Sequence, residues 1–310
     1  MIRSVAYLSM HTSPLLQPGR GSSGGMNVYI NELAQTMARR GIEVVVFTRR
    51  VDPSRPTVVT PRPGYRVVHI TAGAPRGLPM TAMPDLVPEF TEGVLDWMAR
   101  NEARFDLVHS HYWLSGWSGV LVKEALEIPL ANSFHTLGRI KDLTRRLDEA
   151  PASQMRTLTE EEVIGQSDCV IASTPYEFDE LMEHYGATPE RLCTSPPGVD
   201  HRVFRPGDRD EARQWLGLGT EPIVLFAGRI QPLKGPDIAV LLPSRRPSAL
   251  SDTLQAWLEH DRSYPVAGLN VSGLLFQDHI GAREQFGLAQ SHRDQIEAIA
   301  RAVLTSTSNP

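Results

Sequence analysis

Short apolar runs rich in β-branched residues alternate with longer amphipathic stretches along most of the chain, and this alternation limits the fold more than any other feature. Strands alternating with helices favour a mainly parallel sheet with helices on both faces. Ligands of such sheets collect at the carboxyl ends of the strands. The ranges expected to form strands are 4–10, 43–48, 66–71, 106–111, 130–135, 169–174 and 223–227.

The chain divides into a regular first part and an irregular end. Residues 28–40 repeat apolar side chains at helical spacing and stop at Gly41, a typical helix end, which predicts a βαβ unit with the flanking strands. Pro206 and Gly207 mark a linker, so the first, Rossmann-like domain is expected to span 1–205. Residues 206–240 start a second such domain, and residues 241–310 break the pattern.

Composition excludes several classes of protein. The 310 residues carry 31 basic and 36 acidic side chains without long blocks of one sign, which argues against nucleic acid and anionic membranes as partners. No stretch approaches the roughly 18 apolar residues of a membrane span, so no stable insertion is expected. The two cysteines, Cys169 and Cys193, lie in apolar segments, which favours buried free thiols and a cytoplasmic location.

A glycine-rich segment lies between the first expected strand and the first helix, with the sequence GRGSSGGMN at residues 19–27. Glycines let backbone N–H groups approach a phosphate, and a helix N-terminus adds positive potential. The segment has neither the dinucleotide-binding spacing nor a following lysine of the P-loop type. An anion cradle and a plain flexible turn therefore both remain compatible with it.

Three histidines stand at or near the expected carboxyl ends of two strands: His109 and His111 on one, and His135 on the next. Strand alternation places His109 and His111 on one face, so a zinc site has to be considered. No carboxylate or thiolate lies nearby at ligand spacing, and buried, hydrogen-bonded histidines are the favoured interpretation. No metal site is predicted. His135, followed by Thr136, is the best candidate to touch a substrate.

Two further cationic groups have different status. Arg229 and Lys234 lie five residues apart on a loop shaped by glycine and proline, after the last expected strand. A forked guanidinium and a point charge together suit a diphosphate, although a solvated basic loop is the plainer interpretation. Arg156 lies four residues before Glu160 in a helix expected from residue 153 to 166, where a surface residue supported by its neighbour is expected from this spacing alone.

Taken together, the motifs resemble those of the retaining glycosyltransferases of family 4. The resemblance runs from about residue 3 to 240 and implies a GT-B fold, in which two Rossmann-like domains face each other across a cleft. The first domain would be complete and the second incomplete. The motifs are SMHTSP at 9–14, QPG at 17–19, GGMNVY at 24–29, HSHYWLSG at 109–116, HTL at 135–137, PGVD at 197–200, FRPG at 204–207 and GRIQPLKG at 228–235.

The resemblance implies transfer of N-acetylglucosamine from a UDP-sugar to a phosphorylated polyol such as 1D-myo-inositol 3-phosphate, with retention, in mycothiol biosynthesis. No protein nucleophile and no cofactor are implied; assistance by Mg²⁺ and a homodimer are left open. The implied catalytic residues are His135, Arg229 and Lys234. The implied donor contacts are Gln17, Pro18, Gly25, Arg229 and Lys234. The implied acceptor contacts are His11, Asn27, Tyr112, Thr136 and Arg156.

The sequence departs from the family pattern in three places. Ser22 and Ser23 stand where an acidic residue is expected, and Met80 stands where the family has a lysine for the acceptor phosphate. These two changes favour an alternative acceptor, such as a sugar phosphate or a lipid. Two glutamates of the family's second domain have no match after Lys234, which predicts a truncated or frame-shifted reading frame. An inactive fragment without a donor site is the other alternative.

Overall fold

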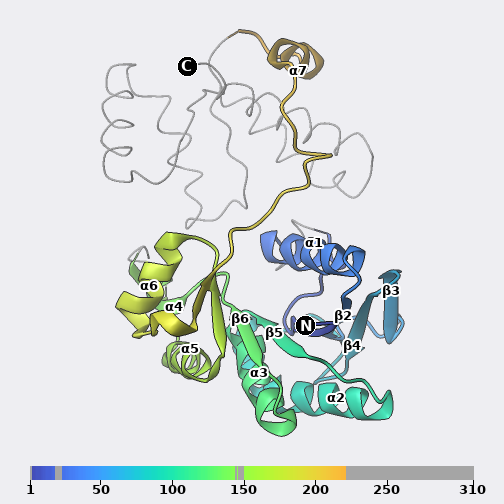
Figure 1. Ribbon diagram of the computed structural model, residues 1–310, viewed down its shortest axis with the longest axis vertical. Coiled ribbons are helices and arrows are strands. Elements are labelled where there is room, and N and C mark those ends of the chain that lie inside the picture. The colour runs from blue at the N-terminus through green and yellow to red at the C-terminus, as the bar shows by residue number, and fades with distance from the viewer. Residues whose placement is uncertain (1, 18–22, 144, 146–149, 221–310) are drawn as a thin grey trace. The chain divides into compact units, whose positions relative to one another are not determined.

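The computed structural model describes residues 2–17, 23–143, 145 and 150–220 (Figure 1). The chain forms two compact units, Met1–Pro197 and Gly198–Pro310. The domain boundary expected near residue 205 lies a short way inside the second unit. Up to residue 220, that unit contains helix α7 (Arg209–Leu216), which the Asp208 side chain caps at its N-terminus. The strand expected at 223–227 and the segment 241–310 lie outside the described residues.

The first unit is built on one eight-stranded sheet with the order β3-β4-β2-β1-β5-β6-β7-β8. Every neighbouring pair is parallel except β3 with β4. The expectation of a mainly parallel α/β sheet is therefore confirmed. The strands are β1 (Ser4–Leu8), β2 (Glu43–Arg49), β3 (Val58–Arg62), β4 (Tyr65–Ile70), β5 (Leu107–His111), β6 (Leu130–Ser133), β7 (Cys169–Ala172) and β8 (Leu192–Thr194).

Helices connect the strands and cover both faces of the sheet (Figure 1). No helix in the described part of the chain is long and apolar enough to cross a membrane. The helices of the first unit are α1 (Gly25–Arg39), α2 (Val87–Arg100), α3 (Trp113–Leu126), α4 (Gly138–Leu143), α5 (Gln154–Gln166) and α6 (Pro175–Tyr185), with short 3₁₀ turns η1 (Met80–Ala82), η2 (Pro84–Leu86) and η3 (Pro189–Arg191).

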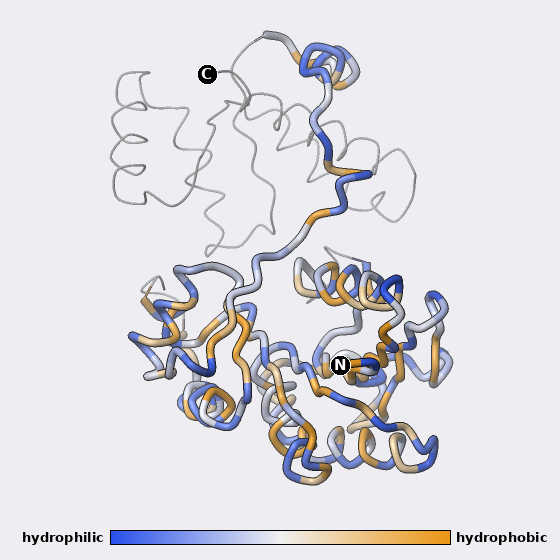
Figure 2. The backbone as a smooth tube through the Cα atoms, viewed as in Figure 1, coloured by the Kyte–Doolittle hydropathy of each residue, from blue (hydrophilic) through white to orange (hydrophobic). Residues whose placement is uncertain are grey.

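The core is split in two by the alternation of side chains along the strands. In β1, Val5 and Tyr7 pack on the face covered by α1, whereas Ala6 and Leu8 pack on the face covered by α2 and α3. Successive side chains of a strand point to opposite faces, so a strand covered on both sides must be apolar throughout. Figure 2 shows this as hydrophobic colour along the central strands, while the helices carry both colours. The apolar runs in the sequence come from this double burial.

The expected strands of the first unit are all present, with ends that differ by a few residues. Sequence analysis missed β3 and β8. The β3 strand is exposed along much of its length and contains Pro61, so it lacks the apolar signal of a buried strand. The β8 strand has three residues, two of which are exposed. Both lie at the edges of the sheet, where one neighbour is missing and the demand for apolar side chains is weaker.

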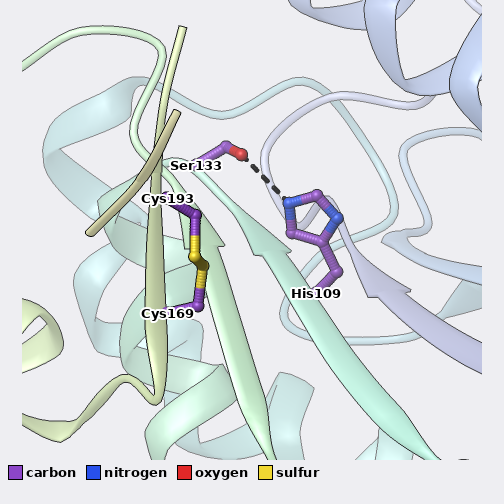
Figure 3. Close-up of a disulfide and its surroundings, with 4 residues drawn as sticks. All are labelled: His109, Ser133, Cys169 and Cys193. Atoms are coloured by element: carbon purple, nitrogen blue, oxygen red, sulfur yellow. Dashed lines mark hydrogen bonds between the residues drawn. A yellow bond between two sulfur atoms is a disulfide. The ribbon is translucent and has the colours of Figure 1, made fainter. Parts of the chain in front are cut away.

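The interpretation of the cysteines as free and buried was wrong. Cys169 in β7 and Cys193 in β8 form a disulfide, with their Cα atoms 6.1 Å apart (Figure 3). Cys193 is exposed and Cys169 is half-buried. The pairing could not be foreseen because it depends on β8, which the sequence does not reveal. Cysteine usage therefore gives no argument for a reducing compartment.

We expect the close contact between α3 and α5 to depend on Gly116. A Cβ atom at this position would lie 2.8 Å from Val163 Cγ1 and 3.0 Å from Asn132 Oδ1. The substitution Gly116→Ala should therefore lower the free energy of unfolding by about 1–2 kcal/mol, measured by urea denaturation. Gly165 in α5 is the matched control, because nothing lies within 4 Å of a Cβ there. Gly165→Ala should be neutral or stabilise by up to about 1 kcal/mol, and equal destabilisation by both changes would contradict this account.

Candidate active site

The carboxyl ends of β5 and β6 meet at one edge of the sheet because the two strands pair in parallel. His111 at the end of β5 lies opposite Ser133 at the end of β6. Tyr112 follows the first strand directly, and His135 follows the second after one intervening residue. Parallel pairing therefore brings together, at one edge of the sheet, residues that sequence analysis singled out on two separate segments of the chain.

Three imidazoles, which we call the histidine column, lie side by side at this edge: His109, His111 and His135. The ring centroids of His109 and His111 are 4.2 Å apart, and those of His111 and His135 are 5.3 Å apart. A hydrogen bond of 3.1 Å joins His111 Nδ1 to His135 Nε2. His109 Nε2 lies 3.0 Å from Ser133 Oγ (Figure 3). His109 is thus a buried, hydrogen-bonded histidine, and the described residues contain no group that could hold a metal ion.

Two tyrosines that sequence analysis missed flank the histidine column. The Tyr7 ring meets His109 and His111 edge-on, at centroid distances of 5.1 and 5.2 Å. Tyr29, in the second turn of α1, meets His135 edge-on at 5.3 Å. In the sequence Tyr7 is one residue of an apolar strand and Tyr29 one residue of an amphipathic helix. Tyr7 carries no signal that separates it from the core, whereas Tyr29 is the last residue of the GGMNVY motif at 24–29, which could have pointed to it.

Burial keeps the imidazoles of this region uncharged at neutral pH. Desolvation lowers the pKa of His109 to about 3 and that of His135 to about 4. Burial, with the neighbouring charges of His135 and Arg156, lowers the pKa of His11 to about 4. Burial also lowers the pKa of His111 well below its ordinary value. These side chains can therefore act as neutral hydrogen-bonding groups, each with one donor and one acceptor nitrogen.

A second group of residues, which we call the arginine cluster, adjoins the histidine column: Arg156, Thr136, Tyr112 and His11. Arg156 Nη2 donates to the Thr136 carbonyl oxygen at 2.9 Å and to its Oγ1 at 3.3 Å. The guanidinium carbon lies 5.2 Å from the centre of the Tyr112 ring, which in turn packs against His11 at a centroid distance of 4.5 Å. Four of the five predicted acceptor residues thus come together. Arg156 is partly buried and contacts Thr136 and Tyr112, so it is not the free surface residue that its spacing alone predicts.

The arginine cluster retains hydrogen-bonding capacity. Arg156 Nη1 makes no hydrogen bond within the described residues, and His11 Nδ1 is buried without a partner among them. Buried polar atoms are ordinarily paired, so an orphaned one beside a cation needs an explanation. A guanidinium with a free edge and a nearby hydroxyl is suited to an anionic oxygen ligand.

Asn27, the fifth predicted acceptor residue, ties two segments of the site together. Its Oδ1 accepts from Gly24 N at 2.9 Å, and its Nδ2 donates to Thr12 Oγ1 and to the Ser13 carbonyl, both at 2.6 Å. The side chain is buried, and these bonds hold the loop after β1 against the N-terminus of α1. The contact of Asn27 with an acceptor stays a prediction.

The predicted donor residues are only partly covered by the structure. Gly25 is the exposed first residue of α1, so its N–H is among those that the helix leaves without an intrahelical partner. Gln17 is exposed on the loop before this helix. Pro18, Arg229 and Lys234 lie outside the described residues. Their roles stay predictions.

Two residues of the site adopt left-handed backbone conformations that side chains rarely take. Tyr112 has φ 79° and ψ 161°, and His135 has φ 61°. Such conformations cost of order 1–3 kcal/mol each and cluster at functional sites. Tyr112 directly follows β5, and His135 follows β6 after one residue, so both stand in the turns that leave the central strands. Two of the residues that sequence analysis selected by motif are therefore among the described non-glycine residues with positive φ, and the other two, Glu102 and Glu127, lie outside the site.

Solved structures with a similar fold define the class of this protein. Sucrose-phosphate synthase from Thermosynechococcus elongatus matches with a TM-score of 0.69 at 27% identity, covering 83% of this chain and 67% of its own. HepE from Anabaena, in complex with UDP and glucose, matches with a TM-score of 0.54 at 15% identity, covering 83% and 66%. The fold is that of the GT-B glycosyltransferases.

The family follows from sequence comparison. Residues 23–203 match the model of Glycosyltransferase Family 4, and the chain belongs to this family. A curated relative from Actinosynnema mirum, a D-inositol 3-phosphate glycosyltransferase, is 48% identical over 241 residues, or 77% of this chain. The aligned part is 58% of that relative's length.

The strain at Tyr112 can be measured by substitution. Replacing Tyr112 by glycine removes the ring and relieves the backbone, whereas alanine removes the ring alone. We expect Tyr112→Gly to be more stable than Tyr112→Ala by about 1–3 kcal/mol in urea denaturation. Leu158, exposed in α5, is the control, because glycine there should be about 1 kcal/mol less stable than alanine. The same order of stabilities at both positions would contradict the assignment of strain.

The buried imidazoles should make the fold sensitive to acid. Because the folded pKa values lie below 6.5, the unfolded chain binds more protons between pH 6.5 and 4, and stability falls as pH decreases through this window. By pH 5.5 each such histidine should cost about 1 kcal/mol relative to pH 7.5, measured as a shift of the urea midpoint. His109→Asn should reduce this loss of stability between pH 7.5 and 5.5 by about 1 kcal/mol, the contribution of one histidine. A stability independent of pH from 7.5 to 5.5 would show that the rings are solvated.

Proposed function

We propose that this protein transfers N-acetylglucosamine from a UDP-sugar to a phosphorylated polyol such as 1D-myo-inositol 3-phosphate, with retention of configuration. The observation that carries the proposal is the arginine cluster beside the histidine column, which offers a forked cation next to neutral hydrogen-bonding rings. The Actinosynnema mirum relative, named as a D-inositol 3-phosphate glycosyltransferase, supports the same acceptor. The chain spans about three fifths of that relative's length, so the activity of the whole enzyme is part of the proposal.

In this proposal the arginine cluster binds the acceptor phosphate. The free Nη1 edge of Arg156 and the Thr136 hydroxyl would contact phosphate oxygens, since charge-assisted bonds from a fork are strong and directional. The unpaired Nδ1 of His11 would contact an adjacent hydroxyl of the polyol. A phosphate placed there brings the acceptor hydroxyls toward His135, which lies one residue before Thr136 in the chain.

The transfer itself would rely on electrostatic stabilisation and not on a protein nucleophile. His135 would hydrogen-bond the transferred sugar as a neutral imidazole, and the N-terminus of α1 at Gly25 would face the donor diphosphate. Arg229 and Lys234 would neutralise the departing UDP, as the family resemblance implies. We therefore propose a reaction without a resident metal ion. We place it in the cytoplasm on the ground of its nucleotide-sugar donor.

A different acceptor is the second candidate, and Met80 favours it. This residue lies in η1 with 39% of its surface exposed, at the position where the family pattern has a lysine for the acceptor phosphate. A thioether cannot neutralise a phosphate. The alternative acceptor is then a sugar phosphate or a lipid, and Arg156 is the cation of the arginine cluster that remains to bind it.

The two candidates differ in which acceptor receives the sugar, so transfer to inositol 3-phosphate is compared with transfer to inositol, to a sugar phosphate and to a lipid acceptor. We expect labelled sugar to pass from UDP-N-acetylglucosamine to inositol 3-phosphate, and only weakly to unphosphorylated inositol. Arg156→Ala should lower kcat/KM for the phosphorylated acceptor by about a hundredfold, because it removes a charged hydrogen-bonding group, while the KM for the donor stays the same. Arg229→Ala or Lys234→Ala should instead abolish donor turnover.

Arg100, exposed in α2 and paired with Asp96, is the matched control for loss of one positive charge. Arg100→Ala should leave transfer unchanged. Equal use of inositol and its phosphate, or indifference to Arg156→Ala, would refute inositol 3-phosphate as the acceptor, and better transfer to a sugar phosphate or a lipid would favour the second candidate. A folded chain that binds neither UDP nor UDP-N-acetylglucosamine in calorimetry would refute catalysis by this chain.

A further inference from the structure

A completely buried carboxylate, Glu160 of α5, lies behind the arginine cluster. Its Oε1 accepts from Arg156 Nε at 2.7 Å, and its Oε2 accepts from the Tyr185 hydroxyl at 2.5 Å. The N–H of Gly138 donates to both oxygens, at 3.1 and 2.9 Å. A buried charge is tolerated only when it is paired and its remaining acceptor sites are used. All three donors thus converge on one side chain.

The three donors come from three different elements. Arg156 lies one turn earlier in α5, Gly138 begins α4, and Tyr185 ends α6. Gly138 also closes the short turn after β6 that carries His135 and Thr136. One carboxylate therefore fixes both the cation of the arginine cluster and the turn that presents the neighbouring hydroxyl.

The contact with Glu160 determines which edge of Arg156 is free. Glu160 occupies Nε, the Thr136 carbonyl and hydroxyl occupy Nη2, and the Tyr112 ring covers one face of the guanidinium. Only Nη1 has no hydrogen-bonding partner within the described residues. A guanidinium held on three sides cannot rotate, so the free edge has one direction. Because the side chain of Arg156 is already fixed, a ligand that binds it loses less free energy to the ordering of that side chain.

We propose that Glu160 is the positioning residue of the acceptor site: it locks the guanidinium of Arg156 and the turn at Gly138 so that Nη1 and the Thr136 hydroxyl face the same anionic group. This inference rests on the proposed binding of the acceptor phosphate by Arg156. Glu160 itself does not touch the acceptor. Its effect on binding passes through Arg156.

Whether removal of the Glu160 carboxylate weakens or strengthens phosphate binding distinguishes a positioning role from a purely electrostatic one. A carboxylate acting only through its negative charge repels an anion, so its removal would strengthen phosphate binding. A positioning carboxylate has the opposite effect, because its removal frees the guanidinium. Glutamine keeps one acceptor oxygen, which can still bond Arg156 Nε, and leucine keeps none. Positioning therefore predicts phosphate affinity in the order glutamate, glutamine, leucine.

The experiment measures two quantities in the full chain and its variants. Inorganic phosphate and inositol 3-phosphate are titrated by calorimetry, and hydrogen exchange of the Arg156 Nε–H is followed by NMR with ¹⁵N-arginine. The variants are Glu160→Gln and Glu160→Leu, each also in an Arg156→Ala background. Glu161→Gln is the matched control, since Glu161 follows directly in α5 and pairs with Arg139.

We expect a protected Nε–H in the wild type, faster exchange in the glutamine variant and the fastest in the leucine variant. Phosphate binding should weaken about tenfold in Glu160→Leu and less in Glu160→Gln. Neither change should matter once Arg156 is alanine, and Glu161→Gln should behave as wild type. If Glu160→Leu does not fold, Glu160→Gln alone tests both quantities.

Unchanged or tighter phosphate binding in the Glu160 variants would overturn the proposal, and so would equal weakening in the Arg156→Ala background. An Nε–H whose protection depends on Glu160, in a chain that binds neither phosphate nor inositol 3-phosphate, would refute the phosphorylated acceptor and leave the locking of Arg156 standing. The two failures are thus distinguishable.

Discussion

The parallel pairing of β5 with β1 and β6 is the constraint on which the site depends. Parallel strands end at the same edge, so the loop after β1, the turn at Tyr112 and the turn at His135 meet although they are far apart in sequence. Each strand is buried on both faces, which holds the register. The chemistry of the site comes from short turns, and the positions of those turns come from the apolar sheet beneath them.

The sequence was sufficient to predict the central strands and the parallel α/β class, because double burial leaves long apolar runs. The residues of the arginine cluster were named by the family resemblance and not by the strand pattern, since spacing alone predicts Arg156 to be a surface residue. The sequence was insufficient where the outcome depends on contacts between distant segments. Glu160 appears in the sequence as a helical neighbour of Arg156, and only the fold brings Gly138 of α4 and Tyr185 of α6 to its buried carboxylate. The bond between Cys169 and Cys193 depends on a three-residue edge strand without an apolar pattern.

The site combines two electrostatic environments within a few residues. Around the histidine column, desolvation by the core holds the imidazoles neutral, so they can donate or accept hydrogen bonds without attracting charge. In the arginine cluster, a buried carboxylate compensates a partly exposed guanidinium, so the cation is kept close to the core without being stranded there. A sugar hydroxyl suits the first environment and an anionic oxygen the second. His135 and Thr136, adjacent in the chain, stand at the boundary between them.

The turns at Tyr112 and His135 are mechanically coupled. His111, the residue before Tyr112, is hydrogen-bonded to His135, and Arg156 contacts both Tyr112 and Thr136. A substitution that relaxes one turn therefore displaces a partner of the other, and its effect depends on which residue the other turn carries. Such a site is expected to show strong epistasis. The effects of paired changes in the two turns would then differ from the sum of the single ones, so the two turns change more readily together than one at a time.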